Sequence, residues 1–328
     1  MQPIFEGKTF VVTGATSGIG LATAAKLAEL GADVIGVGRS AERIQASQNE
    51  VRRRYPRARV TYLQADLSLQ SEVRRLAAEI HEQVAPFGQG SLDGLVNNAG
   101  TFTYWMTLTA EGFETQWAVN HLAPFLLTHE VLDLLRAAPA ARVVTVSSDS
   151  HYNTRLRWKD IQLRRNYNGL LAYQQTKLAN VLFSRELNRR LGADSRLRAL
   201  AADPGLVNTD IGLKDSSPLA RWVWERRRRG GDPAEKPAEG IAFLLGMPLL
   251  AAARQAVYWK DGQPRRPSRY ALDDQAARSL WAISEQMCAL CSAGYGLAGE
   301  IAEPGVETRP ARGWSLPKLR IAGKTGGV

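Results

Sequence analysis

A tyrosine and a lysine stand four residues apart, at Tyr173 and Lys177, in a stretch whose pattern predicts a helix. Positions i and i+4 share one face of a helix, so the lysine ammonium can lie close to the tyrosine phenol. An unperturbed phenol has a pKa of about 10, and a neighbouring cation lowers that pKa by stabilising the phenolate. The pair therefore predicts a tyrosine that exchanges a proton with a reacting oxygen, with the lysine as its partner.

A glycine-rich turn, T-G-A-T-S-G-I-G, joins the first predicted strand to the first predicted helix. Gly14 permits a tight turn, Gly18 lets the backbone approach a pyrophosphate, and Gly20 lets helix and strand pack closely. The free N–H groups and the positive dipole end of the helix then face the phosphates. This strand–turn–helix context predicts a dinucleotide site. The other turn residues that we assign to it are Thr16, Ser17 and Ile19.

The end of the second predicted strand bears on which nicotinamide cofactor binds. An acidic residue here hydrogen-bonds the ribose 2′-OH of NAD, whereas an arginine accommodates the 2′-phosphate of NADP. This strand ends V-G-R-S, so Arg39 can pair with a phosphate and Ser40 can add a hydrogen bond. The sequence therefore favours NADP(H) over NAD(H). The alternative interpretation is that Arg39 is a solvated loop residue.

The glycine pattern, the string N-N-A-G at residues 97–100 and the Y-x-x-x-K pair resemble the short-chain dehydrogenase/reductase family, over roughly residues 5–290. A long stretch at residues 151–170, before the tyrosine, and the Leu280-Trp281 pair look like its retinol-dehydrogenase-like branch. That branch acts on lipophilic alcohols and carbonyls. The resemblance implies an NADP(H)-dependent oxidoreductase that interconverts an alcohol and a ketone or aldehyde, on a bulky lipophilic substrate.

The resemblance also implies roles for individual residues. Ser148, favoured over Ser147, would hold the substrate oxygen, and Asn120 would anchor a water in the proton relay. Tyr173 would be the acid/base, and Lys177 would also reach the cofactor ribose. The remaining cofactor residues implied by the motifs are Asp66 and Leu67 near the adenine, Asn98, Ala99 and Gly100 along the cofactor, and Pro204, Gly205 and Thr209 near the nicotinamide.

Short apolar runs alternate with helical patterns, and these elements must position the residues named above. The runs are apolar on nearly every residue, as strands covered on both faces require, which favours a parallel sheet. The alternation predicts a doubly wound α/β sheet, a Rossmann fold of about seven strands flanked by helices. The predicted strands are residues 9–13, 33–37, 60–64, 92–96, 142–147, 197–201 and 256–259. The predicted helices are residues 19–30, 41–55, 70–84, 111–135, 172–191 and 238–250.

Two segments stand apart from this alternation. We expect residues 1–290 to form one catalytic domain and residues 291–328, rich in Gly, Pro and Arg, to form a C-terminal extension. A polar segment at about residues 212–237 predicts a substrate loop. It carries Trp222, Trp224 and a run of arginines at 226–229, a combination that suits weak peripheral contact with a membrane. The alternative is a loop that packs its tryptophans over the substrate.

Composition excludes several classes of protein. The 328 residues carry a net charge of +10, yet no helix-turn-helix, zinc-finger or RNP-like string is present, so we expect no nucleic-acid partner. The start does not resemble a signal peptide, and no run approaches the roughly 20 apolar residues of a membrane span. We therefore expect a cytoplasmic protein. The family resemblance implies a small-molecule alcohol or carbonyl substrate and a homo-oligomer.

Other chemistries fit the sequence less well. Ser148, Asp149 and His151 are too close in sequence for a nucleophilic triad, and no G-x-S-x-G elbow exists. Cys288 and Cys291 lack the further ligands of a metal site, so we expect two ordinary thiols and no metal. The competing hypothesis of function is a redox sensor that binds NADP(H) without turnover.

Overall fold

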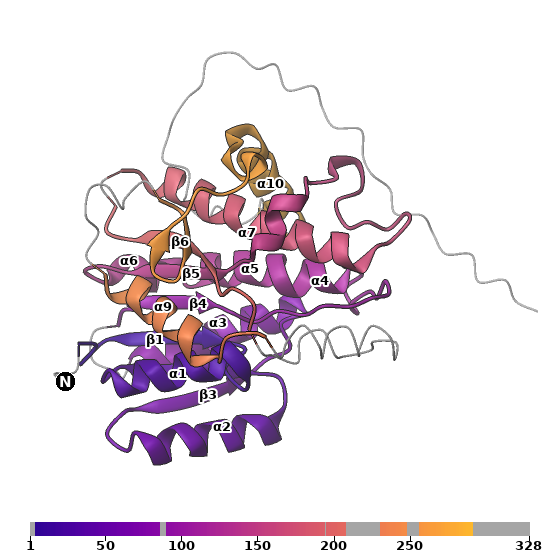
Figure 1. Ribbon diagram of the computed structural model, residues 1–328. Coiled ribbons are helices and arrows are strands. Elements are labelled where there is room, and N and C mark those ends of the chain that lie inside the picture. Colours follow the sequence, from indigo (N-terminus) through magenta and orange to yellow (C-terminus); the bar gives the residue numbers. More distant parts are fainter. Residues whose placement is uncertain (1–3, 86–89, 194, 208–229, 248–255, 291–328) are drawn as a thin grey trace, which may run out of the picture. The chain divides into compact units, whose positions relative to one another are not determined.

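An eight-stranded sheet forms the middle layer of the described part of the protein (Figure 1). The structure is a computed structural model that describes residues 4–85, 90–193, 195–207, 230–247 and 256–290. The strand order is β3-β2-β1-β4-β5-β6-β7-β8, all parallel except β8, which pairs antiparallel with β7. The bounds are β1 Thr9–Thr13, β2 Asp33–Gly38, β3 Val60–Gln64, β4 Gly94–Asn97, β5 Arg142–Val146, β6 Arg198–Asp203, β7 Tyr258–Lys260 and β8 Gln263–Pro264.

Helices cover both faces of this sheet (Figure 1). Helices α1, α2 and α9 lie on one face, α3, α5 and α7 lie on the other, and α10 packs on α7. The helices are α1 Gly18–Glu29, α2 Ala41–Arg54, α3 Gln70–Val84, α4 Thr115–Trp117, α5 Ala123–Glu130, α6 Leu132–Ala137, α7 Gly169–Leu191, α9 Glu235–Gly246 and α10 Asp274–Met287. The shorter helical turns are η2 Ala118–Leu122, η3 Asp149–Asn153, η4 Trp158–Asp160 and η6 Arg269–Leu272.

The predicted doubly wound parallel sheet is confirmed. Every residue of β1, β2, β4, β5 and β6 is buried, because helices cover these strands on both faces. β1 pairs with both β2 and β4, so the order of the strands reverses at β1. In open α/β sheets a ligand binds outside the carboxyl ends of the strands at such a reversal. The residues that follow β1, β2 and β4 therefore meet at one edge of the sheet.

The prediction of one continuous helix over residues 111–135 is wrong. The structure has α4, the π-helical turn η2, α5 and α6 in this region. Pro124 lies in the first turn of α5 and lacks the N–H that an α-helical bond needs, and the wider turn η2 comes directly before it. The start is also later than predicted, because Gly112 has a φ of +81° and the Glu114 side chain caps two N–H groups of α4.

The helix that carries the tyrosine–lysine pair begins earlier than predicted. The Asn168 side chain accepts a hydrogen bond from the N–H of Leu171 at 2.9 Å, so α7 starts at Gly169 rather than at residue 172. The ends of β4, β6, β7 and α9 differ from the predicted bounds by a few residues. β8 was not predicted, and α10, which ends directly before Cys288, lies outside the predicted helical ranges.

Several predicted features lie outside the described residues. They are Thr209, most of the predicted substrate loop with its tryptophans and arginines, Cys291, and the extension at 291–328. The predicted domain boundary near residue 290 therefore stays a prediction. Within the described ranges, no helix is both long and apolar enough to cross a membrane.

Candidate active site

The glycine-rich turn closes tightly against the start of α1 and the end of β4. Gly14 has a φ of +66°, which favours glycine, and a Cβ on it would lie 2.9 Å from the Cα of Ala99. A Cβ on Gly20 would lie 2.2 Å from the carbonyl oxygen of Gly14. Gly18, at a φ of +51°, begins α1, and Ser17 is the N-cap. The N-terminus of α1 can approach the turn this closely only through glycine.

We expect Gly20→Ala to distort this turn. The added methyl group must displace the backbone at Gly14, and such overpacking lowers the free energy of unfolding by about 1–3 kcal/mol. NADPH affinity should fall as well, since the turn forms the predicted phosphate site. Thermal unfolding and calorimetric titration measure the two effects.

The matched control is Gly240→Ala in α9. There the nearest atom to a new Cβ, the amide nitrogen of Gly262, is 3.8 Å away. Alanine in a helix interior should stabilise this site by up to about 1 kcal/mol and leave NADPH binding unchanged. If Gly20→Ala bound NADPH as tightly as the wild type, the turn would not be the phosphate site.

Polar contacts tie the end of β4 to the turn after β1. Thr13 Oγ1 accepts hydrogen bonds from the N–H groups of Asn98 and Ala99, each at 3.0 Å. The Nδ2 of Asn98 donates to the carbonyl oxygen of Thr13 at 2.8 Å. Three of the predicted cofactor residues, Gly14, Asn98 and Ala99, therefore lie together.

Strands β2 and β3 support the same turn from the other side. The N–H of Ala15 donates to the carbonyl oxygen of Val37 at 2.9 Å, and the Tyr62 hydroxyl donates to the carbonyl oxygen of Ala15 at 3.1 Å. Thr16 lies over Gly38, where a Cβ would be 2.4 Å from the Thr16 methyl carbon. Together with the end of β4, the strands β2 and β3 therefore hold the turn in place.

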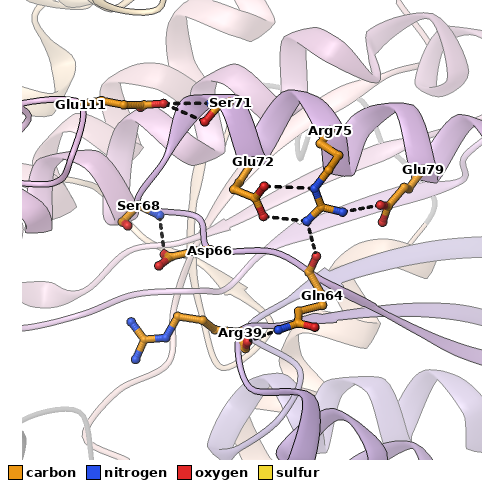
Figure 2. Close-up of polar contacts among 9 residues, drawn as sticks. All are labelled: Arg39, Gln64, Asp66, Ser68, Ser71, Glu72, Arg75, Glu79 and Glu111. Carbon is orange, nitrogen blue, oxygen red and sulfur yellow. Dashed lines mark hydrogen bonds and ion pairs between the residues drawn. The ribbon is translucent and has the colours of Figure 1, made fainter.

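The side chain of Arg39, which directly follows β2, forms no hydrogen bond or ion pair within the described part of the chain. Figure 2 shows the Arg39 guanidinium directed away from its neighbours, and only its backbone carbonyl oxygen is bonded, by Nε2 of Gln64 at 3.0 Å. Nearby Arg75, by contrast, pairs with Glu72 and Glu79 and donates to the carbonyl oxygen of Gln64 (Figure 2). Arg39 therefore presents an exposed guanidinium to any anionic group at this edge.

The other predicted cofactor residues lie at the same edge. Ser40 caps α2, where its hydroxyl accepts a hydrogen bond from the N–H of Arg43 at 3.4 Å. Oδ1 of Asp66 accepts from the N–H of Ser68 at 3.0 Å (Figure 2). Partly buried residues complete the set: Ile19, Leu67 and Gly100.

Tyr173 and Lys177 lie on one face of α7, as their spacing predicts. Nζ of Lys177 is 5.3 Å from the centre of the Tyr173 ring. The lysine is buried, and its ammonium donates to the carbonyl oxygen of Val146, the last residue of β5, at 3.0 Å. The tyrosine is partly buried, and the centre of its ring lies 5.8 Å from that of the Phe102 ring, in an edge-to-face arrangement. The pair is thus fixed against β5 on one side and the loop after β4 on the other.

The pKa values of the pair differ from the expectation. Burial, with the negative charges of Asp149 and Asp203, raises the pKa of Tyr173 above its ordinary value. Burial lowers the pKa of Lys177 to about 8, although the charge of Asp203 acts in the opposite direction. In the protein alone the pKa of the phenol is therefore raised, against the lowering expected from a neighbouring cation, because burial disfavours the charged phenolate.

We expect Lys177→Met to stabilise the cofactor-free protein while removing activity. The unfolded chain keeps this lysine protonated up to a pKa of about 10.4, whereas the folded chain releases the proton above a pKa of about 8. The buried lysine therefore lowers the free energy of unfolding by its full amount below about pH 8. This cost disappears as the pH rises to about 10.4. With the lost bond to Val146 subtracted, the gain near neutral pH should be about 2 kcal/mol. Thermal unfolding as a function of pH measures it, and a gain that persists at high pH would contradict the lowered pKa.

Ser147 and Ser148 have different environments. Ser147 is buried, and its hydroxyl donates to the carbonyl oxygen of Lys177 at 2.8 Å. Ser148 is partly exposed, and its hydroxyl accepts from the N–H of Ser150 and donates to the carboxylate of Asp149, each at 3.2 Å. Of the two hydroxyls, only that of Ser148 is free of the core, which supports its predicted role over that of Ser147.

Asn120 is buried in the π-helical turn η2 and joins two parts of the site. Its Oδ1 accepts from the N–H of Thr101 at 2.7 Å, and its Nδ2 donates to the carbonyl oxygen of Thr101 at 2.9 Å. The same Nδ2 donates to the Thr176 hydroxyl at 3.2 Å. The side chain therefore fastens the loop after β4 to α7, and its predicted role as a water anchor stays a prediction.

A buried carboxylate that the sequence prediction did not include lies at the end of β6. The two oxygens of Asp203 accept from the N–H of Gly205 at 2.9 Å and from the hydroxyl of Tyr258 at 2.7 Å. Nζ of Lys260 lies 3.6 Å from the same carboxylate. The string Asp203-Pro204-Gly205 was visible in the sequence, but its partners come from β7. This carboxylate acts on the pKa values of both the tyrosine and the lysine of α7.

His151 is a structural link and not a catalytic base. Its Nδ1–H donates to the carbonyl oxygen of Ser148 at 2.7 Å, and its Nε2 accepts from the N–H of Ser268 at 3.0 Å. A carbonyl oxygen only accepts and an amide only donates, so the ring is neutral with its proton on Nδ1. Burial lowers the pKa of His151, in keeping with the neutral form. Both ring nitrogens are engaged by backbone atoms, which argues against the triad with Ser148 and Asp149.

Comparisons with known proteins agree with this geometry. A family model described as short chain dehydrogenase matches residues 8–219. Retinol dehydrogenase 14 of Mus musculus is 33% identical over 303 residues, which cover 87% of this chain and 86% of that protein. An uncharacterized protein from Mycobacterium Paratuberculosis is 35% identical, with a TM-score of 0.66, over 87% of this chain and 94% of that one. A short chain dehydrogenase from Burkholderia cenocepacia J2315, solved in complex with NADP, is 25% identical, with a TM-score of 0.60, over 82% of this chain and 99% of that one.

Proposed function

The chain belongs to the short chain dehydrogenase family, and from this premise we propose that it is an NADP(H)-dependent enzyme that interconverts a bulky lipophilic alcohol and its ketone or aldehyde. Family membership makes it an oxidoreductase that uses a nicotinamide dinucleotide. The choice of NADP(H) and the class of substrate are the proposal. The observation that carries it is the Tyr173–Lys177 pair on one face of α7. Its lysine ammonium bonds the carbonyl oxygen of Val146 at the carboxyl end of β5, and Ser148 follows two residues later.

The residues at the carboxyl edge of the sheet fit NADP(H). Gly14 and Gly20 let the turn, the start of α1 and the end of β4 pack more closely than a Cβ would permit. This close packing brings the N-terminus of α1 up to the turn, where its N–H groups can meet a pyrophosphate. The exposed guanidinium of Arg39 and the Ser40 hydroxyl, which follow β2, support the choice, because a 2′-phosphate needs a cation and a hydrogen bond. The solved relative from Burkholderia cenocepacia, whose structure contains NADP, supports the same choice.

The side chains divide the chemistry between them. When bound, NADPH would supply the hydride for the carbonyl carbon. Tyr173 donates its phenolic proton to the developing alkoxide oxygen, and its raised pKa keeps that proton in place until the charge forms. The Ser148 hydroxyl, which donates to Asp149 in the protein alone, can turn and donate its hydrogen bond to the same oxygen instead. The ammonium of Lys177, 5.3 Å from the ring centre, stabilises the phenolate that remains.

The surroundings of Tyr173 support an apolar substrate. The rings of Phe102 and Tyr104 are partly exposed and pack edge to face, with their centres 4.8 Å apart. The Phe102 ring also contacts the Tyr173 ring. Leu206, beyond the turn that ends β6, is exposed. The relative from Mus musculus is named for retinol, an apolar alcohol. The cytoplasmic location and the homo-oligomer expected from the sequence are also part of the proposal.

Aldehydes and ketones of increasing apolar size, offered with NADPH or NADH, test the proposal. We expect turnover with NADPH and a kcat/KM that rises with the apolar size of the carbonyl compound. A preference for NADH would contradict the cofactor assignment, and a preference for small polar carbonyls would contradict the substrate class. Tight NADPH binding without turnover of any carbonyl would favour a redox sensor instead.

A further inference from the structure

The stretch at residues 151–170, which leads from β5 into α7 and is named the insert, carries an excess of positive charge. Five cations and one carboxylate lie between Thr154 and Leu170. The carboxylate, Asp160, accepts hydrogen bonds from backbone N–H groups, at 2.9 Å each. No cation of the insert forms an ion pair with a residue that the structure describes. These exposed cations are Arg155, Arg157, Lys159, Arg164 and Arg165.

Large apolar side chains are exposed beside these cations. Trp105 is 72% exposed and Leu170 is 56% exposed, and Leu108 and Trp158 are exposed as well. Single apolar residues are common on protein surfaces, but a group of them on neighbouring segments marks a contact surface. Two of the four are tryptophans, whose amphipathic ring suits a boundary between water and an apolar phase.

Hydrogen bonds and close packing hold the two segments together. The Arg164 guanidinium donates to the carbonyl oxygen of Gly112, and the Gln162 side chain accepts from the N–H of Glu114 at 2.8 Å. The hydroxyl of Tyr167 donates to the buried carboxylate of Glu114, also at 2.8 Å. The insert therefore runs along the loop that carries Trp105 and Leu108, and the charged and apolar side chains share this part of the surface.

This surface adjoins the catalytic tyrosine. A Cβ on Gly169, the first residue of α7, would lie 2.1 Å from the carbonyl oxygen of Thr103 and 3.0 Å from the Cα of Tyr104, so Leu170 sits next to the loop after β4. The Tyr104 ring packs on the Phe102 ring, which in turn contacts the Tyr173 ring. A partner bound here would thus lie next to the first turn of α7.

We propose that the insert face, defined as Trp105, Leu108, Leu170, Arg164 and Arg165, docks on an anionic lipid surface. Exposed arginines that form no ion pair within the described residues attract acidic headgroups, and tryptophan and leucine enter the boundary between headgroups and acyl chains. This combination matches a membrane better than a soluble partner, because both charge and apolar contact are needed. The proposal adds a location to the proposed function: an apolar substrate could pass from the bilayer to Tyr173 without crossing water.

Co-sedimentation with vesicles, with no substrate or cofactor present, tests the insert face. The full chain should sediment at low ionic strength with phosphatidylcholine vesicles that contain phosphatidylserine, but not with phosphatidylcholine alone, and salt should release it. The double variant Arg164→Glu/Arg165→Glu should bind at least about tenfold more weakly. Trp105→Ser, which changes no charge, should weaken binding severalfold at unchanged thermal stability.

The matched control reverses two exposed cations that have no ion pair in the described residues, Arg53 and Arg57. They lie on and after α2, which covers the β3 edge of the sheet, away from α7. Arg53→Glu/Arg57→Glu makes the same change in net charge and should stay within about twofold of wild-type vesicle binding. An equal loss in the control, or no sedimentation of the wild type with anionic vesicles, would overturn the proposal. Both double variants should reduce a water-soluble carbonyl at the wild-type rate, so a failure of the enzyme assignment would be seen separately.

Discussion

Replacing Tyr173 with phenylalanine should lower kcat by a factor of about 10²–10⁴ while NADPH binds as tightly as to the wild type. Phenylalanine keeps the ring that contacts Phe102 and lies near the ammonium of Lys177, so the packing of α7 is preserved. The substitution removes only the phenolic hydroxyl, and the alkoxide that develops on the substrate then lacks its acid. Steady-state kinetics with NADPH, together with a fluorescence titration of NADPH, measures the two quantities.

A second tyrosine provides the control for this experiment. Tyr270, on η6, has a hydroxyl that accepts a hydrogen bond from Arg269 at 2.8 Å. Tyr270→Phe should leave kcat within about twofold of the wild type. If Tyr173→Phe were fully active, Tyr173 would not be the acid. If both variants lost activity in parallel, the loss would reflect a general sensitivity of the fold.

Arg39→Asp should shift the cofactor preference from NADPH toward NADH by about three orders of magnitude. The substitution removes a charge-assisted hydrogen bond to the 2′-phosphate, of about 1.5–3 kcal/mol, and adds a carboxylate that repels the phosphate. The same carboxylate can accept a hydrogen bond from the ribose 2′-OH of NADH. Because only the backbone of Arg39 is bonded in the described residues, the change removes no internal side-chain contact. The ratio of kcat/KM for the two cofactors gives the shift directly.

The neighbouring Arg75 is the control for charge at this edge. Its guanidinium is engaged by Glu72 and Glu79, so it has little freedom to meet a phosphate (Figure 2). Arg75→Ala should change the cofactor ratio by no more than about threefold. A shift as large as that of Arg39→Asp would mean that net positive charge, and not the position of Arg39, selects the cofactor.

Residues that depend on one local element could be predicted from the sequence. Tyr173 and Lys177 share a helical face whatever surrounds the helix, because spacing alone determines this. Gly14 and Gly20 belong to a single turn, and their close approach is a property of that turn. The parallel sheet was likewise predictable, since nearly continuous apolar runs are what two covered faces require.

Contacts between distant segments could not be predicted. Asp203 meets Tyr258, 55 residues further on, and His151 meets Ser268, 117 residues further on. No periodicity in either segment signals such a pairing, because it depends on how the strand ends align. The raised pKa of Tyr173 has the same origin, since it depends on burial and on carboxylates from other elements.

The interruption of the helix predicted over residues 111–135 had one local signal in the sequence, Pro124. Apolar residues continue through this stretch, which favours one helix. Pro124 cannot donate the backbone hydrogen bond of an α-helix, and the wide turn η2 lies directly before it. The turn places Asn120 where its amide reaches both Thr101 and Thr176, so the irregularity contributes to the site itself.

Transfer of deuterium to a lipophilic aldehyde or ketone, from NADPH that carries deuterium at both positions of the reactive carbon of the nicotinamide, tests the proposed reaction most directly. We expect the wild type to form an alcohol that carries the label on the former carbonyl carbon, and Tyr173→Phe to form it at least about a hundredfold more slowly. An unlabelled alcohol, or NADPH binding with no alcohol formed from any lipophilic carbonyl, would contradict the assignment of Tyr173 and Lys177 as the centre of an NADP(H)-dependent oxidoreductase.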